Sequence, residues 1–476
     1  MIDDRFIGRK RGLFMNIQFF GACQQVTGSC YLIEVANKKI LIECGMFQGS
    51  RENQQHNGDD FPFAASELDA VVISHAHLDH SGRLPLLIKA GFRGSVFTHR
   101  ATVELCKIML TDSGYIHEKE AQWENKKRQR KGLELVEPLY TVADAENTLA
   151  YLTGIDYHQE IEICPNAKLT LKDAGHIIGS AIIELTLTEG DNTKNIVFSG
   201  DLGHKDAPIL RDPEMIKHAD LVLMESTYGD RLHRSWQDTW QEMGDIIAQA
   251  KSSKGNIIIP AFTIGRTQEL LYEFKRHYQQ WNIDSWDIFL DSPMAIKATK
   301  VYSQHSEVYD RKAEKVDQKN DSIFDLEKLH FSESTEYSMK INNIKSGAII
   351  IAGSGMCTGG RIKHHLKHNI WRENAHILIV GFQAKGTLGR ALVDGAKTIK
   401  LWGETMQVNA NIHTIGGFSA HADQQGLLNW YNYFENSPKV VLVHGEPEAM
   451  ETLAQKLKYE HGADVTVAKY MQRISL

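Results

Sequence analysis

A short apolar run leads directly into three histidines and one aspartate in the stretch VVISHAHLDHSG, residues 71–82. His75 and His77 are two residues apart at the end of an expected strand, and extended backbone places alternate side chains on one side, so both can bind one metal ion. Asp79 and His80 follow where the chain turns toward a helix, and we expect them to serve a neighbouring ion. Nitrogen and oxygen ligands of this kind suit zinc, with manganese as the alternative.

Two complete metal sites need more ligands, and each should also follow an apolar strand. His176 in KDAGHIIGSA, Asp201 in NIVFSGDLG and His444 in KVVLVHGE meet this condition. Any one of them alone is more often a hydrogen-bonded histidine or a turn aspartate. Together with the first motif they predict a second half of the metal centre, in which the Asp201 carboxylate could bridge two ions.

Length and charge limit the classes of protein that fit. A chain of 476 residues exceeds what one core normally supports, so we expect two domains or one domain inserted in another. The net charge of −7 gives no overall basic field, so nucleic acid would have to bind in a local groove. The longest apolar runs are too short to cross a bilayer, and Asp3 and Asp4 stand where a signal peptide would be basic. We therefore expect a cytoplasmic protein with no membrane partner, and the six cysteines form no C-x-x-C pair, which fits reduced thiols.

The rhythm of expected elements changes along the chain. The first two hundred residues combine short strands, several of them suited to hairpins, with helices, which favours α/β layering of an α+β kind. From about residue 229, helices alternate with buried strands such as NIIIPAF and GAIIIAGSG, the pattern of a parallel, doubly wound sheet. After about residue 406 the chain returns to a strand, a helix and the apolar run KVVLVHG. No repeat or low-complexity linker separates these parts, which favours an insertion held by packing.

The motifs SHAHLDHSG, DAGHIIGSA and FSGDLG, in this order, resemble the metallo-β-lactamase superfamily. Within it, LMESTYGDR, FSAHAD and LVHGE look like motifs of the β-CASP nucleases. The resemblance implies a four-layer αβ/βα sandwich interrupted by an inserted β-CASP α/β cap domain. It divides the chain into an N-terminal extension at 1–14, the first part of the metallo-β-lactamase domain at 15–228, the β-CASP domain at 229–405 and the C-terminal part of the first domain at 406–476.

The resemblance also assigns roles. It implies two Zn²⁺ ions per chain, the first held by His75, His77 and His176, the second by Asp79, His80 and His444, with Asp201 bridging them. Asp79, Glu225 and His421 are the expected catalytic residues. Glu225 would orient His421, which would protonate the leaving ribose oxygen because imidazole titrates near the working pH.

Phosphate-binding groups should accompany the metals. The stretch GSGMCTGGRIKHHL places Ser354 and Gly355 shortly before a helix, where free backbone N–H groups favour an anion. Arg266 and Arg361 follow glycines at helix starts and could pair with phosphate oxygens. We interpret the nearby histidines as a polar helix face beside the substrate cleft, because no carboxylate or thiolate stands near them: His364, His365 and His368. The run KKRQRK at 126–131 is expected to be a solvated helix end, with an outer phosphate-contacting patch as the alternative.

The position of His444 separates branches of the family, since a histidine resembles the RNA-processing branch and a valine is typical of the DNA-repair branch. The chain resembles the compact bacterial and archaeal relatives of the cleavage and polyadenylation nuclease more than ribonuclease J. We therefore expect a two-metal ribonuclease that hydrolyses single-stranded RNA, as an endonuclease, a 5′ exonuclease or both.

Two other functions stay open at this stage. One is a small-molecule metallohydrolase such as a lactonase, thioesterase or β-lactamase, although a small substrate needs no long inserted cap. The other is a catalytically silent RNA-binding subunit, although all seven expected ligands are present. The sequence also leaves open a homodimer and a protein partner that supplies specificity.

Overall fold

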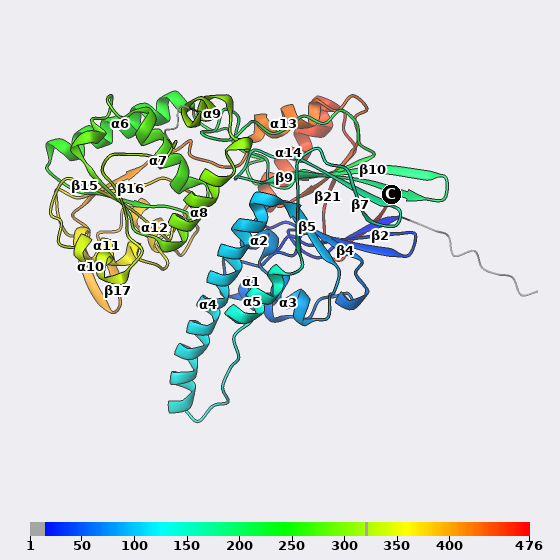
Figure 1. Cartoon of the computed structure of the whole chain (residues 1–476), viewed down its shortest axis with the longest axis horizontal. Coiled ribbons are helices and arrows are strands. Elements are labelled where there is room, and N and C mark those ends of the chain that lie inside the picture. The colour runs from blue at the N-terminus through cyan, green and yellow to red at the C-terminus, as the bar shows by residue number, and fades with distance from the viewer. Residues whose placement is uncertain (1–14, 319–321) are drawn as a thin grey trace, which may run out of the picture.

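The computed structural model describes residues 15–318 and 322–476, so the expected N-terminal extension at 1–14 lies outside the described residues. Two seven-stranded sheets form one body and a six-stranded sheet forms a second body beside it (Figure 1). A long helix extends away from the first body, at the bottom of the view. In the described part of the chain, no helix is long and apolar enough to cross a membrane.

The first sheet has the strand order β22-β1-β2-β3-β4-β5-β6. Its first four strands pair antiparallel and the rest pair parallel, from β3 to β6. Its strands are β1 (Asn16–Phe19), β2 (Tyr31–Val35), β3 (Lys38–Ile42), β4 (Ala70–Val72), β5 (Ser95–His99), β6 (Leu152–Ile155) and β22 (Arg473–Ser475).

The second sheet has the order β21-β20-β11-β10-β9-β8-β7. It is antiparallel from β7 to β10 and parallel from β10 to β21. Its strands are β7 (Ile161–Cys164), β8 (Ala167–Asp173), β9 (Ala181–Glu189), β10 (Asn192–Phe198), β11 (Leu221–Glu225), β20 (Lys439–Val443) and β21 (Val465–Val467).

The two sheets pack face to face, because alternate residues along their strands are apolar and point inward. Tyr31 of the first sheet, for example, stacks on Phe198 of the second with ring centroids 6.4 Å apart. Helices cover the outer faces, which confirms the expected αβ/βα sandwich. On the first sheet these are α1 (Arg51–Gln55), α2 (Leu78–Ser81), α3 (Leu84–Lys89), α4 (Arg100–Arg130) and α5 (Val142–Leu149), and on the second α13 (Gln424–Asn432) and α14 (Pro447–His461).

The inserted body is a doubly wound domain, as the alternation of helices and buried strands predicts. All five strand pairs of its sheet, ordered β14-β13-β15-β12-β16-β19, are parallel. Its strands are β12 (Ile257–Pro260), β13 (Asp287–Leu290), β14 (Leu329–Phe331), β15 (Ala348–Ala352), β16 (His376–Ile379) and β19 (Asn411–Thr414), with a hairpin of β17 (Thr398–Leu401) and β18 (Glu404–Gln407) beside them. The expected domain boundary at 405 therefore falls before the last strand of this sheet.

Helices cover both faces of this parallel sheet, which buries the long isoleucine runs of its strands. The helices on one face are α6 (Trp236–Ser252), α7 (Arg266–Arg276) and α8 (Pro293–Gln304). The remaining helices of this domain are α9 (Arg311–Asp317), α10 (Thr335–Ile341), α11 (Ile362–Asn369) and α12 (Leu388–Val393). Local chemistry fixes several helix ends. Ser235 caps α6 by accepting from the Asp238 N–H, and Gly462 ends α14 in the left-handed conformation.

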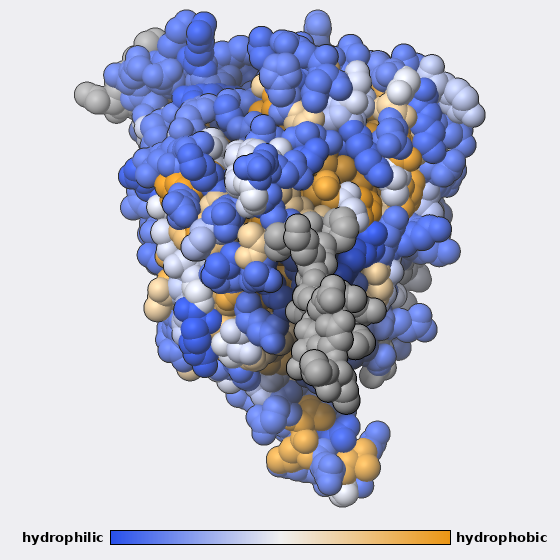
Figure 2. Space-filling model, turned by 90° about the vertical axis from the view of Figure 1, so that its right-hand side faces the viewer, coloured by the Kyte–Doolittle hydropathy of each residue, from blue (hydrophilic) through white to orange (hydrophobic). Residues whose placement is uncertain are grey.

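Helix α4 is an arm of 31 residues, about 46 Å long at 1.5 Å per residue. Its first turns pack between the two bodies, against α8. Its last turns project from the molecule, where Figure 2 shows hydrophobic residues among hydrophilic ones. Trp123 is 68% exposed there and the run at 126–131 forms the exposed end. The expectation of a solvated helix end is confirmed, since basic groups also suit the negative end of the helix dipole.

Candidate metal centre

The expected metal ligands all follow strands that end at one edge of the sandwich. His75 and His77 follow β4, whereas Asp79 and His80 lie on α2. His176 follows β8, Asp201 follows β10 and His444 follows β20; these three strands run in the same direction because β8 and β10 both pair antiparallel with β9. Strands that run in the same direction have their carboxyl ends at one edge of the sheet. Residues as far apart in the sequence as His75 and His444, which are separated by 369 positions, therefore belong to one cluster.

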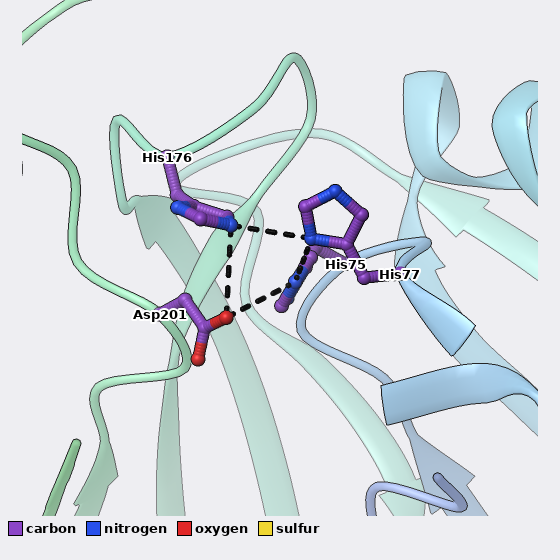
Figure 3. Close-up of side chains that lie close together, drawn as sticks. All are labelled: His75, His77, His176 and Asp201. Carbon is purple, nitrogen blue, oxygen red and sulfur yellow. Dashed lines mark hydrogen bonds and ion pairs between the residues drawn. The ribbon is translucent and has the colours of Figure 1, made fainter. Parts of the chain in front are cut away.

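The first group consists of His75, His77, His176 and Asp201, one donor atom from each lying within 4.8 Å of the others. His77 Nδ1 is 3.0 Å from His75 Nε2 and 3.2 Å from His176 Nε2. The Asp201 Oδ2 atom is 3.4 Å from His75 Nε2 and 3.6 Å from His176 Nε2. Figure 3 shows the two pairs approaching from opposite sides, His75 and His77 from the first sheet and His176 and Asp201 from the second.

The second group consists of Asp79, His80 and His444. His80 Nε2 is 3.3 Å from His444 Nε2, which is 3.5 Å from Asp79 Oδ2. Asp201 reaches this group with its other oxygen, Oδ1, which lies 3.3 Å from His80 Nε2 and 3.7 Å from His444 Nδ1. Each oxygen of Asp201 therefore faces a different group of donors.

The chemistry of these donors fits metal ions. Burial lowers the pKa of His75, His77 and His176, and neighbouring histidines add to this effect. Burial alone would raise the pKa of Asp201, but His444 and His80 outweigh it and hold the pKa well below its ordinary value. Neutral imidazole and ionised carboxylate are the forms that ligate metals. Asp201 Oδ1 is also buried without a hydrogen-bond donor among the described residues, which a bound cation would satisfy.

Outer partners hold the ligand rings in place. Ser74 Oγ lies 2.9 Å from His75 Nδ1, the Ala420 carbonyl lies 3.0 Å from His176 Nδ1, and Thr227 Oγ1 lies 3.1 Å from His444 Nδ1. Contacts of this kind fix the tautomer and orientation of metal-binding imidazoles.

Glu43 is a functional candidate that the sequence reasoning missed. It is buried, its Oε2 lies 3.4 Å from His80 Nδ1, and its Oε1 accepts from the Ser74 N–H at 2.9 Å. Burial acts to lower the pKa of His80, but the Asp201 and Glu43 carboxylates outweigh it and raise that pKa well above its ordinary value. A sequence signal for Glu43 was available, because this acidic residue directly follows the apolar strand β3. The other ligands were found by the same rule, that a ligand follows an apolar strand.

The backbone at the site is strained. Glu43 and His444 have φ of 64° and 52°, in the left-handed region that non-glycine residues rarely adopt. Gly200, with φ of 55°, precedes Asp201, and a Cβ there would lie 2.8 Å from the Ala181 carbonyl oxygen and 2.9 Å from Ser74 Cβ. The strand ends are therefore shaped to bring these side chains together.

Glu225 and His421 lie beside the first group. His421 Nδ1 is 3.2 Å from Glu225 Oε1 and 4.0 Å from Asp201 Oδ2. Glu225 is fully buried at the end of β11, where its Oε1 also accepts from the Leu202 N–H at 2.7 Å. Burial acts to lower the pKa of His421, but Glu225 and Asp201 outweigh it and raise that pKa to about 9. Glu225 and His421, which the sequence motifs predict to act as a pair, are thus in direct contact in the structure.

The structure gives the two expected phosphate-binding arginines internal partners. Arg266 is 6% exposed and donates to Glu269 and the Phe418 carbonyl, and its guanidinium lies 4.6 Å from the centre of the Phe418 ring. Arg361 donates to Asp291 at 2.7 Å and to the Ser332 carbonyl at 2.8 Å. These contacts use part of each guanidinium, which has five N–H donors, and Arg266 Nε is buried with no hydrogen-bond partner among the described residues.

The interpretation of His365 as part of a polar helix face was wrong. His365 is fully buried, and its Nε2 lies 2.6 Å from Asp291 Oδ2, so a carboxylate partner does exist. The sequence could not reveal it because Asp291 follows β13 and is 74 residues away. No metal group that includes this helix is found among the described residues.

Ser354 and Gly355 lie in the loop after β15, at the carboxyl edge of the parallel sheet. Ser354 Oγ accepts from the Thr358 and Gly359 N–H groups at 3.1 and 3.2 Å. A Cβ at Gly355 would lie 2.8 Å from the Phe262 ring, in the loop that precedes α7. A Cβ at Gly265, in that same loop, would lie 3.3 Å from Ile177, which neighbours His176. This edge of the cap domain therefore faces the metal centre.

The fold and the site together define a class of metal-dependent hydrolase, built on an αβ/βα sandwich with a doubly wound insertion. Three family descriptions match the chain: Metallo-beta-lactamase superfamily at 24–96, Beta-Casp domain at 267–392 and Zn-dependent metallo-hydrolase RNA specificity domain at 405–468. The chain belongs to the metallo-β-lactamase superfamily, in the β-CASP family.

Its relatives cover nearly its full length. Ribonuclease TTHA0252 of Thermus thermophilus is 36% identical over 96% of this chain and 99% of its own. Transcription termination factor FttA of Methanocaldococcus jannaschii is 31% identical over 91% of this chain and 67% of its own. A crystal structure of a protein of unknown function from Enterococcus faecalis V583 matches 97% of this chain and 100% of its own, with a TM-score of 0.55 and 13% identity, and shows the shared fold alone.

Proposed function

We propose that this protein is a two-metal ribonuclease that hydrolyses phosphodiester bonds of single-stranded RNA. One observation carries the proposal: each oxygen of Asp201 faces its own group of donors, with the Glu225–His421 pair alongside. The match to an RNA specificity domain and the full-length likeness to a ribonuclease favour RNA as the substrate.

The proposed ligands divide as the two groups do. His75, His77 and His176 would hold one Zn²⁺, and Asp79, His80 and His444 the other, with Asp201 shared between them. Mn²⁺ is the alternative, because it accepts the same nitrogen and oxygen donors. When bound, such a pair of ions lowers the pKa of a water molecule and stabilises the charge that develops on the phosphoryl group.

The chain's own residues supply the remaining steps. Glu225 takes the Nδ1 side of His421, which leaves Nε2 as the nitrogen able to protonate the leaving ribose oxygen. Ser354 and Gly355 are proposed to contact the RNA backbone from the facing edge of the cap. Arg266 and Arg361 are proposed to bind phosphate with the donors that their internal contacts leave unused, while those contacts position the Phe418 segment and the loop after β13.

Two alternatives are less well supported. A small-molecule hydrolase has no use for the RNA specificity domain that the chain matches. A silent RNA-binding subunit has no need to keep seven donors and their outer partners in contact. Cutting of RNA but not of DNA with the same sequence, beside a test of ester and lactam substrates, distinguishes the three functions.

Removal of metal is expected to abolish RNA hydrolysis and to destabilise the protein. Ions that bind the folded state but not the unfolded state stabilise it by about 4 kcal/mol at a thousandfold excess over the dissociation constant. Elemental analysis of the purified protein should give about two transition metal ions per chain. Dialysis against EDTA, followed by calorimetry and an RNA assay, should show a lower Tm and no cutting, and Zn²⁺ or Mn²⁺ should restore both. Full activity of metal-free protein would contradict the proposal.

The His421→Ala variant is expected to lower kcat by roughly 100-fold to 10,000-fold, the usual contribution of a general acid. Both ions should stay bound, because His421 belongs to neither the first nor the second group of donors. The measurement is single-turnover RNA hydrolysis with metal content determined on the same sample. Loss of metal along with activity would instead identify His421 as a ligand.

A further inference from the structure

A row of aromatic rings leads away from the metal centre. The ring centroids of His421 and Tyr228 lie 6.1 Å apart, and the next steps are 4.8 Å to His233 and 4.9 Å to His204. His204 stacks on Trp236 at 4.8 Å, and Trp236 stacks on Trp240 at 5.2 Å with only 14° between the ring planes. The two tryptophans are four residues apart on α6 and therefore share one helix face.

This row ends in a cavity between the two bodies. The cavity has a volume of about 390 Å³ and is lined by Trp236, Trp240, Arg276, His277 and Lys312 together with Asp206 and three glutamines. A second cavity of about 610 Å³ adjoins it and shares Asp206 and Lys312. Neither cavity includes a residue of the metal groups.

The lining of the smaller cavity is chemically suited to single-stranded nucleic acid. Trp236 lies between the rings of His204 and Trp240, so Trp240 is the ring with a face left for a base. Trp240 is half-buried and lines the cavity, and a base can stack on such a face whatever its sequence. Arg276 donates to Glu273, so Lys312 is the cation of this cavity that is offered to a phosphate. Glutamine amides at its rim can bond to bases or to ribose. Both tryptophan rings pack against the hydrophobic core and keep part of their surface exposed, unlike the buried Trp286 and Trp430.

We propose that Trp240, with Trp236 stacked behind it, forms a base-stacking site for single-stranded RNA outside the reacting phosphodiester, with Lys312 contacting the phosphate backbone. The inference rests on the proposed ribonuclease function and adds a second site at which the protein binds the RNA strand. The strand would be held several nucleotides away from the bond that is cut, within the span of roughly 4 to 16 nucleotides usual for such sites.

Equilibrium binding of a 5′-fluorescein adenylate dodecamer tests the site. We would use metal-free protein, so that the RNA stays intact, and measure anisotropy over a range of salt concentrations. Trp240→Ala should weaken binding roughly tenfold, the usual effect of losing one stacked base. Trp236→Ala should weaken binding too, because it removes the ring that supports Trp240. Trp236→Phe should keep most of the affinity, because phenylalanine retains a stacking face.

Two further variants separate stacking from charge. Lys312→Gln should reduce the slope of log affinity against log salt by about 0.7, the value for one phosphate contact on a single strand, and the tryptophan variants should leave this slope unchanged. Trp371→Ala is the matched control, since Trp371 is 53% exposed at the end of α11 and lines neither cavity. It should bind RNA as the wild-type protein does.

The outcomes distinguish the site from the function. Wild-type affinity in both alanine variants, with an unchanged slope in Lys312→Gln, would overturn the stacking site even if the metal-loaded enzyme cuts RNA. Wild-type protein that neither binds nor cuts the dodecamer would overturn the proposed function and this site with it. If an alanine variant is misfolded by circular dichroism, the Trp236→Phe affinity and the Lys312→Gln slope decide.

Discussion

The Asp201→Ala and His77→Ala variants are each expected to lose RNA hydrolysis by about a thousandfold or more, equivalent to roughly 4 kcal/mol of transition-state stabilisation. Asp201 is the only residue with oxygens facing both donor groups, among the residues described, so its loss removes a ligand from each. His77 contributes to one group alone. Asp201→Ala should therefore lower the metal content of both sites, and His77→Ala chiefly that of the first.

Elemental analysis and single-turnover assays on the same preparations measure both effects. Circular dichroism should show both variants folded, because neither change touches the hydrophobic cores. Asp59→Ala is a suitable control, since Asp59 is an exposed aspartate whose side chain pairs with the exposed His56. Near wild-type hydrolysis by both Asp201→Ala and His77→Ala would rule out the two-metal mechanism.

The largest effect on stability is expected from Asp291→Ala in the cap domain. Asp291 is fully buried and accepts from Arg361 at 2.7 Å, lies 2.6 Å from His365 Nε2, and accepts from Ser338 Oγ at 2.6 Å. Its removal leaves buried polar groups without their carboxylate, at a cost of about 3–5 kcal/mol. The Tm of the cap domain should fall by on the order of 10 °C, since each kcal/mol shifts a domain of this size by a few degrees.

Calorimetry of Asp291→Ala beside Ser338→Ala tests this expectation, because Ser338 makes only one of the contacts.

The pH dependence of stability gives a second check. Burial alone would raise the pKa of Asp291, but hydrogen bonds from His365 and Ser338 outweigh it and lower that pKa to about 2. Its stabilising contribution is therefore complete above the ordinary value near 4 and is lost as pH falls toward 2. An Asp291→Ala protein as stable as the wild type at pH 7 would contradict the assignment.

The sequence predicted those features that depend on local patterns. The isoleucine runs and their alternation with helices predicted a parallel, doubly wound insertion, and the rule that ligands follow apolar strands found His176, Asp201 and His444. The same rule would have found Glu43, had it been applied to β3. Motif resemblance supplied the αβ/βα architecture and the pairing of Glu225 with His421, which no spacing within the chain could reveal.

Partners brought together from distant segments could be known only from the tertiary structure. Arg266 and Arg361 look like free phosphate ligands in the sequence because Phe418 and Asp291, which lie 152 and 70 residues away, are not recognisable as their partners there. His365 looks solvent-exposed for the same reason. The ring row and its cavity depend on packing α6 against the loop after β10 and against α9.

The sequence by itself thus determined which side chains stand at strand ends and which helix and strand patterns carry them, because backbone periodicity and turn chemistry act over a few residues. The tertiary structure alone decided which of these side chains share a metal group, which arginines are already engaged, and where a cavity opens between the two bodies. Those properties arise from contacts between segments that are 70 to 364 residues apart, and no local pattern encodes such contacts.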